Sequence, residues 1–94
     1  MKLLGKNHLV NAARRHPDIR SALAAWKLEV EEAAWATPAE LKLRYPMASF
    51  LGKENVIFNI RAGNYRLHAR VNFVTSVVIV VRVGTHAEYN RWTF

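Results

Sequence analysis

The chain has 94 residues, enough for one domain with one hydrophobic core, so we expect residues 1–94 to form a single domain. It has no cysteine, which excludes disulfides, cysteine-based zinc sites and a cysteine nucleophile, and favours a cytoplasmic location. The longest apolar run, Val77 to Val81, is far shorter than the roughly 20 residues of a membrane span, and the net charge of +7 favours an anionic partner.

The first half of the chain is rich in alanine, leucine, glutamate and lysine, which indicates helices. Met1 to Leu4 fits a short edge strand, and Lys6 to Arg15 fits a first helix. A second helix is expected to begin at Pro17 and to end near Trp35. Its buried face follows from apolar residues three and four apart: Ile19, Leu23, Trp26, Val30 and Ala33.

A short third helix follows. Thr37-Pro38-Ala39-Glu40 has the pattern of a capping box with proline in the first turn, so the helix should begin there and run to about Arg44. Pro46 is expected to end it.

The second half is rich in valine, asparagine, arginine and aromatic residues, which indicates strands. Three are predicted, at Val56 to Arg61, Tyr65 to Val74 and Val77 to Val83, with short turns between them. Short turns predict antiparallel pairing. The last strand is nearly all β-branched, so we expect it to be central and covered on much of both faces. The predicted fold is α+β, with N-terminal helices packed on one face of an antiparallel sheet and the other face open and basic.

Polar residues two apart along the second strand must share one face. They are Arg66, His68, Arg70 and Asn72, and neighbouring strands add Asn59, Arg61 and Arg82. Arginines two apart lie roughly 7 Å from each other, close to the spacing of successive phosphates. This pattern favours a phosphodiester backbone as counterion, although a solvated outer face would show the same pattern.

The segment after the last strand carries two groups that could move protons. His86 and Tyr89 are three residues apart, so in a helical turn they share a face. An imidazole can pass protons near neutral pH and a phenol can donate to a leaving oxygen, but a purely structural pair has the same spacing. Trp26, Trp35, Phe58 and Phe73 are interpreted as core. Trp92 and Phe94 could form a C-terminal anchor or stack on a base, and the first interpretation is favoured.

Metal catalysis has little support in the sequence. The four histidines show no ligand spacing, and Glu88 is the only acid in the last forty residues. We therefore expect neither a metal nor a cofactor.

Several stretches together resemble the HigB-type toxins of type II toxin–antitoxin systems. They are Val56–Arg61, Gly63–Leu67, Arg70–Phe73 and Gly84–Asn90, together with His16-Pro17-Asp18, the Trp26 helix and Pro38–Lys42. The resemblance implies the RelE-like fold and mRNA interferase activity, which several members exert on the translating ribosome. It also implies a helix-turn-helix antitoxin of the HigA type as partner, and repression of their own promoter by the pair.

The resemblance places Arg66 and Arg70 in the basic strand of the family, and His86 and Tyr89 in its C-terminal motif. The family often has an aspartate after that tyrosine, where this chain has Asn90. His68 stands where an apolar residue is expected, so we leave it out of the predicted catalytic set.

These observations give one hypothesis, a metal-independent endoribonuclease that cleaves mRNA. Arg66 and Arg70 hold the scissile phosphate, and His86 and Tyr89 serve as base and acid in either order. Further RNA contacts are assigned to Asn59, Arg61, Asn72 and Arg82. Attack by the 2′-hydroxyl would leave a 2′,3′-cyclic phosphate or 3′-phosphate and a 5′-hydroxyl. The alternative is a non-catalytic nucleic-acid-binding or protein-interaction module of the same fold, such as a gyrase-directed toxin.

Overall fold

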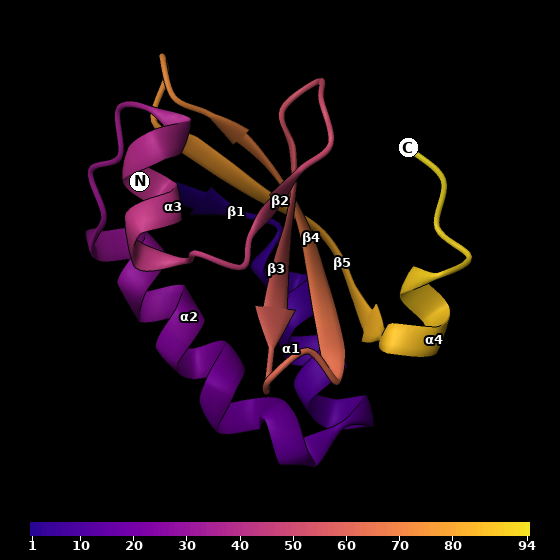
Figure 1. Ribbon diagram of the computed structural model, residues 1–94. Coiled ribbons are helices and arrows are strands. Elements are labelled where there is room, and N and C mark those ends of the chain that lie inside the picture. The colour runs from indigo at the N-terminus through magenta and orange to yellow at the C-terminus, as the bar shows by residue number, and fades with distance from the viewer.

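Five strands form one sheet in the order β1-β5-β4-β3-β2, and the computed structural model describes all residues from 1 to 94 (Figure 1). The strands are β1 (Lys2–Leu4), β2 (Ser49–Phe50), β3 (Asn55–Ile60), β4 (Tyr65–Asn72) and β5 (Val77–Thr85). The helices are α1 (Lys6–Arg15), α2 (Arg20–Glu32), α3 (Pro38–Arg44) and α4 (His86–Tyr89). β1 runs parallel to β5, and every other pair is antiparallel, so the predicted α+β fold is confirmed.

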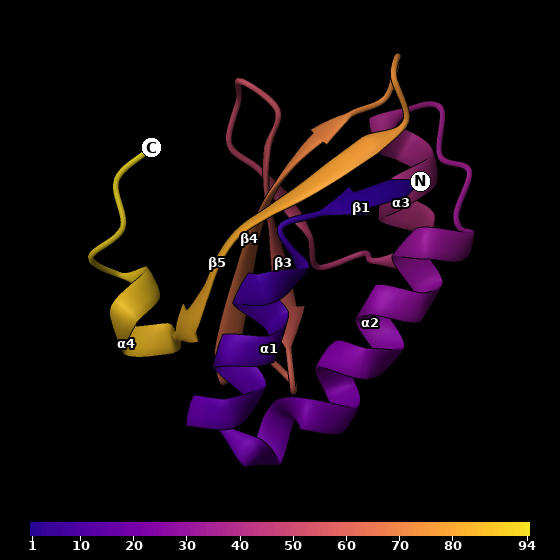
Figure 2. The same ribbon diagram turned by 180° about the vertical axis from the view of Figure 1, so that it is seen from behind.

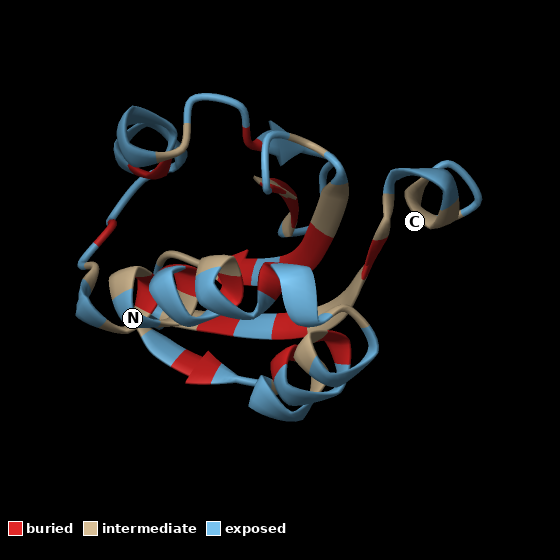
Figure 3. Ribbon diagram, turned by 90° about the horizontal axis from the view of Figure 1, so that it is seen from below, coloured by how far each residue is buried: buried red, intermediate tan, exposed pale blue.

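Helices cover the two faces of the sheet unequally. α1 and α2 lie across one face, with β1 beside them (Figure 2), and α4 lies beyond the end of β5 on the other side of the molecule (Figure 1). α4 has no buried residue, in contrast to β1, β3, β4 and β5 and to the inner sides of α1 and α2 (Figure 3). We call the face away from α1 and α2 the open face.

The core lies between the sheet and these helices. It is built from alternate strand residues and from helix residues three or four apart, as their periods require. Its buried members are Leu3, Leu9, Ala12, Ile19, Leu23, Trp26, Val30, Trp35, Leu41, Ala48, Val56, Phe58, Ile60, Leu67, Ala69, Val71, Val78 and Val80. Phe73 is half-buried and packs against this cluster, so the aromatic residues interpreted as core are all placed there.

The N-terminal elements agree closely with the prediction, with one difference in length. Pro17 opens a short 3-10 turn before α2, and α2 ends at Glu32 rather than near Trp35, because the backbone becomes extended at Ala33. α3 begins with the expected cap, in which the Thr37 side chain accepts a hydrogen bond from the amide of Glu40. Gly5 allows α1 to start close to the sheet, since a Cβ there would lie 2.3 Å from the carbonyl oxygen of Val80.

The last strand agrees with the prediction in part. β5 lies inside the sheet, paired with β1 and with β4, as expected for a central strand, but its open side is only partly covered: Ile79 is 41% exposed. β5 also contains a bulge, since Val80 pairs with Ala69 and Arg82 pairs with His68, which leaves Val81 without an opposite residue. This extra residue changes the alternation, so that Val80 faces the core whereas Arg82 faces the open side.

No helix has the length and apolar character that crossing a membrane would require.

Candidate active site on the open sheet face

Three cross-strand rows on the open face include a residue from each of β3, β4 and β5. The first row is Asn59, Arg66 and Gly84; the middle row is Ile57, His68 and Arg82; the third row is Asn55, Arg70 and Ile79. Each row has a charged or ionisable residue of β4 at its centre. The three rows differ in what covers them and in what neutralises their charge.

The first row holds an arginine without a carboxylate partner. Arg66 donates a hydrogen bond to the carbonyl of Gly63, and its guanidinium lies over the Tyr89 ring, 5.3 Å from the centroid. None of the ion pairs in the molecule includes Arg66. Arg66 therefore keeps a positive charge that no acid of the protein compensates.

Gly84 allows the C-terminal segment to lie directly against this row. A Cβ on Gly84 would lie 2.8 Å from Cζ2 of Trp92 and 3.2 Å from the Glu88 side chain. Real Cβ atoms do not approach other atoms so closely, so any larger residue would push α4 and Trp92 away. The missing side chain brings Tyr89 within reach of Arg66.

α4 is short but is fixed by a capping box. The Thr85 hydroxyl accepts from the amide of Glu88 at 3.1 Å, and the Glu88 carboxylate accepts from the amide of Thr85 at 2.9 Å. The hydrogen bond from the Thr85 amide lowers the pKa of Glu88, and Arg15 at 3.4 Å lowers it further. The box therefore ties α4 to the end of β5 and, through Arg15, to α1.

α4 carries both predicted proton-transfer groups. The rings of His86 and Tyr89 have centroids 6.4 Å apart, and Nδ2 of Asn90 lies 3.4 Å from Nδ1 of His86. The chain thus places the side-chain amide of Asn90 beside the imidazole of His86.

The middle row is closed by the C-terminal tail. His68 is only 5% exposed, and the rings of Trp92 and Phe94 lie 6.3 and 4.8 Å from its ring. The Arg82 guanidinium lies 4.5 Å from the Trp92 ring and donates to the carbonyl of Thr93 at 3.1 Å. Arg82, predicted to contact RNA, instead holds the tail on the sheet.

His68 is a neutral structural residue. Its Nδ1 accepts from Nε of Arg82 at 3.2 Å, and its Nε2 lies 2.8 Å from Oδ1 of Asn55. Because an arginine nitrogen can only donate, the imidazole proton must be on Nε2. Burial lowers the pKa of His68 to about 4, with smaller contributions from the charges of Arg82 and Arg70.

The third row is neutralised within the protein. Arg70 pairs with Glu54 at 3.6 Å, and Glu54 also accepts from Nδ2 of Asn72 at 2.7 Å. Oδ1 of Asn72 accepts from the amides of Val74 and Thr75, so its side chain holds the β4–β5 turn. Arg70 and Asn72 therefore do not join Arg66 in one pocket, contrary to the arrangement that the sequence suggested.

Arg61 does not lie on the open face. It follows β3 in a turn with a left-handed backbone, and its guanidinium contacts Asp18 at 2.5 Å. The Tyr65 hydroxyl donates to the same carboxylate at 2.9 Å and, with Arg61, lowers the pKa of Asp18. Arg61 thus ties the β3–β4 turn to the 3-10 turn before α2, so its predicted position on the RNA-facing side is wrong.

Of the eight predicted site residues, the structure brings four together at the first row and its edge. They are Asn59, Arg66, His86 and Tyr89. Sequence reasoning missed the capping box of Thr85 and Glu88, although their spacing is the usual signature of one. It also missed Gly84 as a point of close approach and Glu54 as the partner of Arg70. No three histidine, aspartate or glutamate side chains gather in a way that could hold a metal ion.

Comparison with known families agrees with this architecture. The family model described as HigB toxin, RelE-like toxic component of a toxin-antitoxin system, matches residues 19–92, which is most of the chain. The chain belongs to the HigB toxin family. The RelE-like fold predicted for it is thereby confirmed, and the matched region includes β3, β4, β5 and α4.

Membership of the HigB toxin family has two direct consequences. A toxin of a toxin-antitoxin system has a cognate antitoxin, and toxins of the HigB and RelE type are typically ribonucleases. A search of curated proteins found no match to this HigB-family chain.

Proposed function

We propose that this HigB-family toxin is an endoribonuclease that cleaves mRNA in the cytoplasm, without a metal or cofactor, at the first row of the open face. The observation that carries the proposal is the state of Arg66. It has no carboxylate partner, and it lies against Tyr89, whose ring is near that of His86, the other predicted proton-transfer group of α4.

In the proposed reaction the RNA phosphate takes the place of the missing counterion. The guanidinium of Arg66 binds the scissile phosphate through paired N–H donors and stabilises the extra negative charge of the transition state. The Asn59 amide, opposite Arg66 on β3, contacts the neighbouring part of the nucleotide. Arg70 acts outside this centre, and its part in RNA binding is limited to the electrostatic attraction of the third row.

The chemical step is an intramolecular transesterification of the RNA phosphodiester. The 2′-oxygen attacks phosphorus, the bond from phosphorus to the 5′-oxygen breaks, and a 2′,3′-cyclic phosphate and a 5′-hydroxyl result. One of His86 and Tyr89 takes the proton of the 2′-hydroxyl, and the other gives a proton to the leaving 5′-oxygen. Water can then open the cyclic phosphate to a 3′-phosphate.

Family membership supports the following proposal for the cellular role. Cleavage takes place on mRNA, including mRNA in translating ribosomes, and stops translation until a helix-turn-helix antitoxin of the HigA type neutralises the toxin. The basic charge of the chain favours both RNA partners.

The test is to induce the toxin and to map the 5′ ends of cellular mRNA. Wild type should create discrete new 5′-hydroxyl ends, which become ligatable only after phosphorylation, and cutting in extracts should persist in EDTA. Arg66→Ala should abolish both toxicity and the new ends. Growth arrest with intact mRNA, or with DNA damage, would support the non-catalytic, gyrase-directed alternative.

Two variants of α4 test the proton transfers. Tyr89→Phe keeps the ring that lies under Arg66 and removes only the hydroxyl, and His86→Ala removes the imidazole. Each should lower the cleavage rate by about 10²-fold or more, because general acid–base groups contribute about 10²–10⁴-fold. If both variants cut at the wild-type rate, the acid and base lie elsewhere.

A further inference from the structure

A cavity adjoins the first row on the far side of Asn59. β2 pairs only with Val56 and Ile57, so the outer edge of β3 is left unpaired beyond Ile57. A cavity of about 290 Å³ lies there. It is lined by Arg44, Tyr45, Pro46, Met47, Ala48, Asn59 and Ala62.

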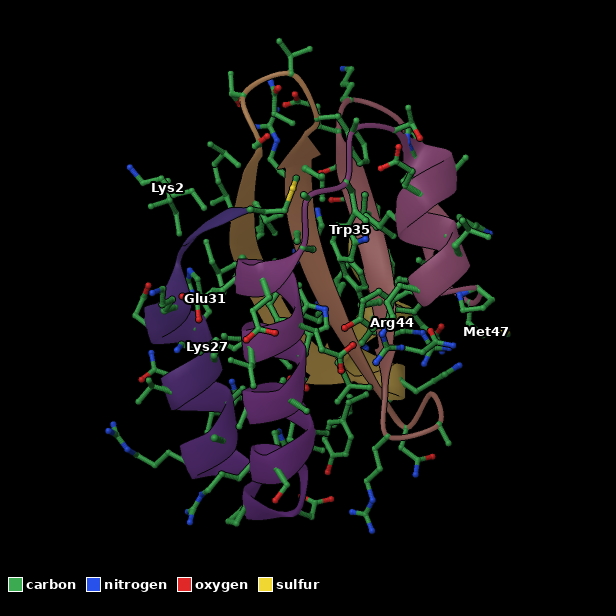
Figure 4. All side chains as sticks on the ribbon, turned by 90° about the vertical axis from the view of Figure 1, so that its left-hand side faces the viewer. Lys2, Lys27, Glu31, Trp35, Arg44 and Met47 are labelled. Atoms are coloured by element: carbon green, nitrogen blue, oxygen red, sulfur yellow. The ribbon has the colours of Figure 1, made fainter.

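The wall of this cavity is mainly apolar and is firmly supported. The Tyr45 ring packs edge-on against Phe58 and Trp35, with centroids 5.2 and 5.9 Å away, and its hydroxyl donates to Glu29 at 3.1 Å. Arg44 pairs with the same glutamate and lies 4.9 Å from the Tyr45 ring. Met47, in contrast, is 70% exposed and follows α3, whose last residue is Arg44, on the side of the molecule away from α1 (Figure 4).

Asn59 is shared by the cavity and the first row. A Cβ built on Gly63 would lie 3.2 Å from Nη1 of Arg66 and 3.8 Å from Nδ2 of Asn59, so both side chains converge on that glycine. Asn59 is only half-buried, and none of the side-chain hydrogen bonds of the protein involves its amide. A donor and an acceptor are thus free between an uncompensated guanidinium and an apolar cavity.

We propose that this cavity binds the base of a nucleotide next to the phosphate held by Arg66, and that Asn59 hydrogen-bonds the edge of that base. The proposal rests on the proposed function. A base is flat and largely apolar on its faces and polar on its edge, which matches an aromatic and methionine wall with one free amide. The amide lies between the two, so one nucleotide can reach both the cavity and the arginine. The site would give the toxin a sequence preference at one position.

A double-mutant cycle, with one change in the protein and one in the RNA, tests whether Asn59 contacts the base. An oligoribonucleotide, presented on programmed ribosomes if free RNA is not cut, carries either a normal base or an abasic sugar at each position next to the cleaved bond. With wild type, the abasic sugar at one position should slow cleavage about tenfold, the effect of losing one good hydrogen bond. Asn59→Ala should slow cleavage of the normal RNA, and the abasic sugar should then cost clearly less than it costs wild type, because the hydrogen bond to the base is already lost.

Two more variants check the wall and the specificity of the effect. Met47→Ala should weaken the preference for the base at that position by a few fold. Leu43→Ala is the matched control, because Leu43 is 84% exposed on α3 and does not line the cavity, and it should cut as wild type does. All variants should keep the thermal midpoint of wild type to within a few degrees.

The outcomes separate this proposal from the proposed function. If Arg66→Ala cuts normally, or wild type cuts no RNA, the proposed function fails and the base site with it. If Arg66→Ala is inactive but Asn59→Ala keeps both the wild-type preference and the sensitivity to the abasic sugar, only the base site is wrong. Unchanged cleavage with weakened neutralisation by the antitoxin would also overturn it and assign the cavity to a protein partner.

Discussion

Arg66 and Arg70 lie on the same face of the same strand, yet the protein treats them differently. Arg66 has no acid partner and lies over Tyr89, whereas Arg70 is paired with Glu54. Between them His68 is sealed under the C-terminal tail, which Arg82 holds in place. The two-residue alternation of a strand determines which side chains share a face. The C-terminal tail over the middle row determines which of them can act together.

The largest expected effect separates the two arginines. Arg66→Ala should lower the cleavage rate by about 10²–10³-fold, the usual cost of removing one transition-state donor. Arg70→Ala should change it by no more than about fivefold, because it removes only an exposed charge that is already paired. Initial cleavage rates of the two variants and of wild type on one RNA substrate measure both effects. Equal losses would mean that RNA crosses the middle row and that the two ends of the face form one site.

Gly84→Ala tests the contact that brings α4 to Arg66. The new Cβ would overlap Trp92, and a displacement of about 1 Å in a catalytic group can cost up to roughly 10²-fold in rate. We expect a loss of about tenfold or more, with little change in overall secondary structure by circular dichroism.

The control for Gly84→Ala is its combination with Trp92→Ala. If the overlap with Trp92 is the cause, the alanine at position 84 should cost far less activity when the indole is absent. Additive losses in the double variant would show that the glycine matters for another reason.

Much of the fold follows from the sequence because local patterns encode it. The helix at Lys6–Arg15, the cap at Thr37 and the alternation of β3 and β4 all depend on neighbours in the chain. The parallel pairing of β1 with β5 joins residues more than seventy positions apart, and β2 is too short to show a period. Such non-local or very short elements leave little trace in local composition.

The site was harder to predict because its decisive features are exceptions to alternation. The bulge at Val81 turns Arg82 toward the open face, whereas strict alternation from Val80 would have turned it toward the core. The left-handed turn at Arg61 carries that side chain to Asp18. The pairing of Arg70 with Glu54 depends on a loop outside the strands. Spacing alone therefore identified candidate residues but not which of them lie together.

His68, where an apolar residue was expected, gives the middle row a measurable pH response. The pKa of His68 is about 4 in the folded protein and ordinarily 6.5. Between these values the unfolded chain binds a proton that the folded protein excludes, so stability should fall as the pH drops from 6.5 to 4. One unit of pKa corresponds to about 1.4 kcal/mol. Because the ring keeps polar partners that offset part of this penalty, the free energy of unfolding should fall by roughly 2 kcal/mol.

Urea unfolding at several pH values measures this loss, and His68→Gln is the control. Glutamine can still donate to Asn55 and accept from Arg82 but does not titrate, so this part of the pH dependence should disappear. The carboxyl groups of Asp18, Glu31 and Glu88 have lowered pKa values and titrate mainly below this range, equally in both proteins. The same slope in both would assign the pH response to other groups.

The smallest effect concerns the capping box that fixes α4. Thr85→Ala removes the acceptor for the Glu88 amide and should cost about 1 kcal/mol, the typical value for an N-cap. Because α4 is a terminal element, the loss should appear first as faster hydrogen exchange at the Glu88 amide rather than as a lower thermal midpoint. Thr85→Ser keeps the hydroxyl and should exchange as wild type does. If serine and alanine behave alike, the methyl group of Thr85 rather than its hydroxyl holds α4, and the imidazole and phenol beside Arg66 depend on packing against β5 instead of on the cap.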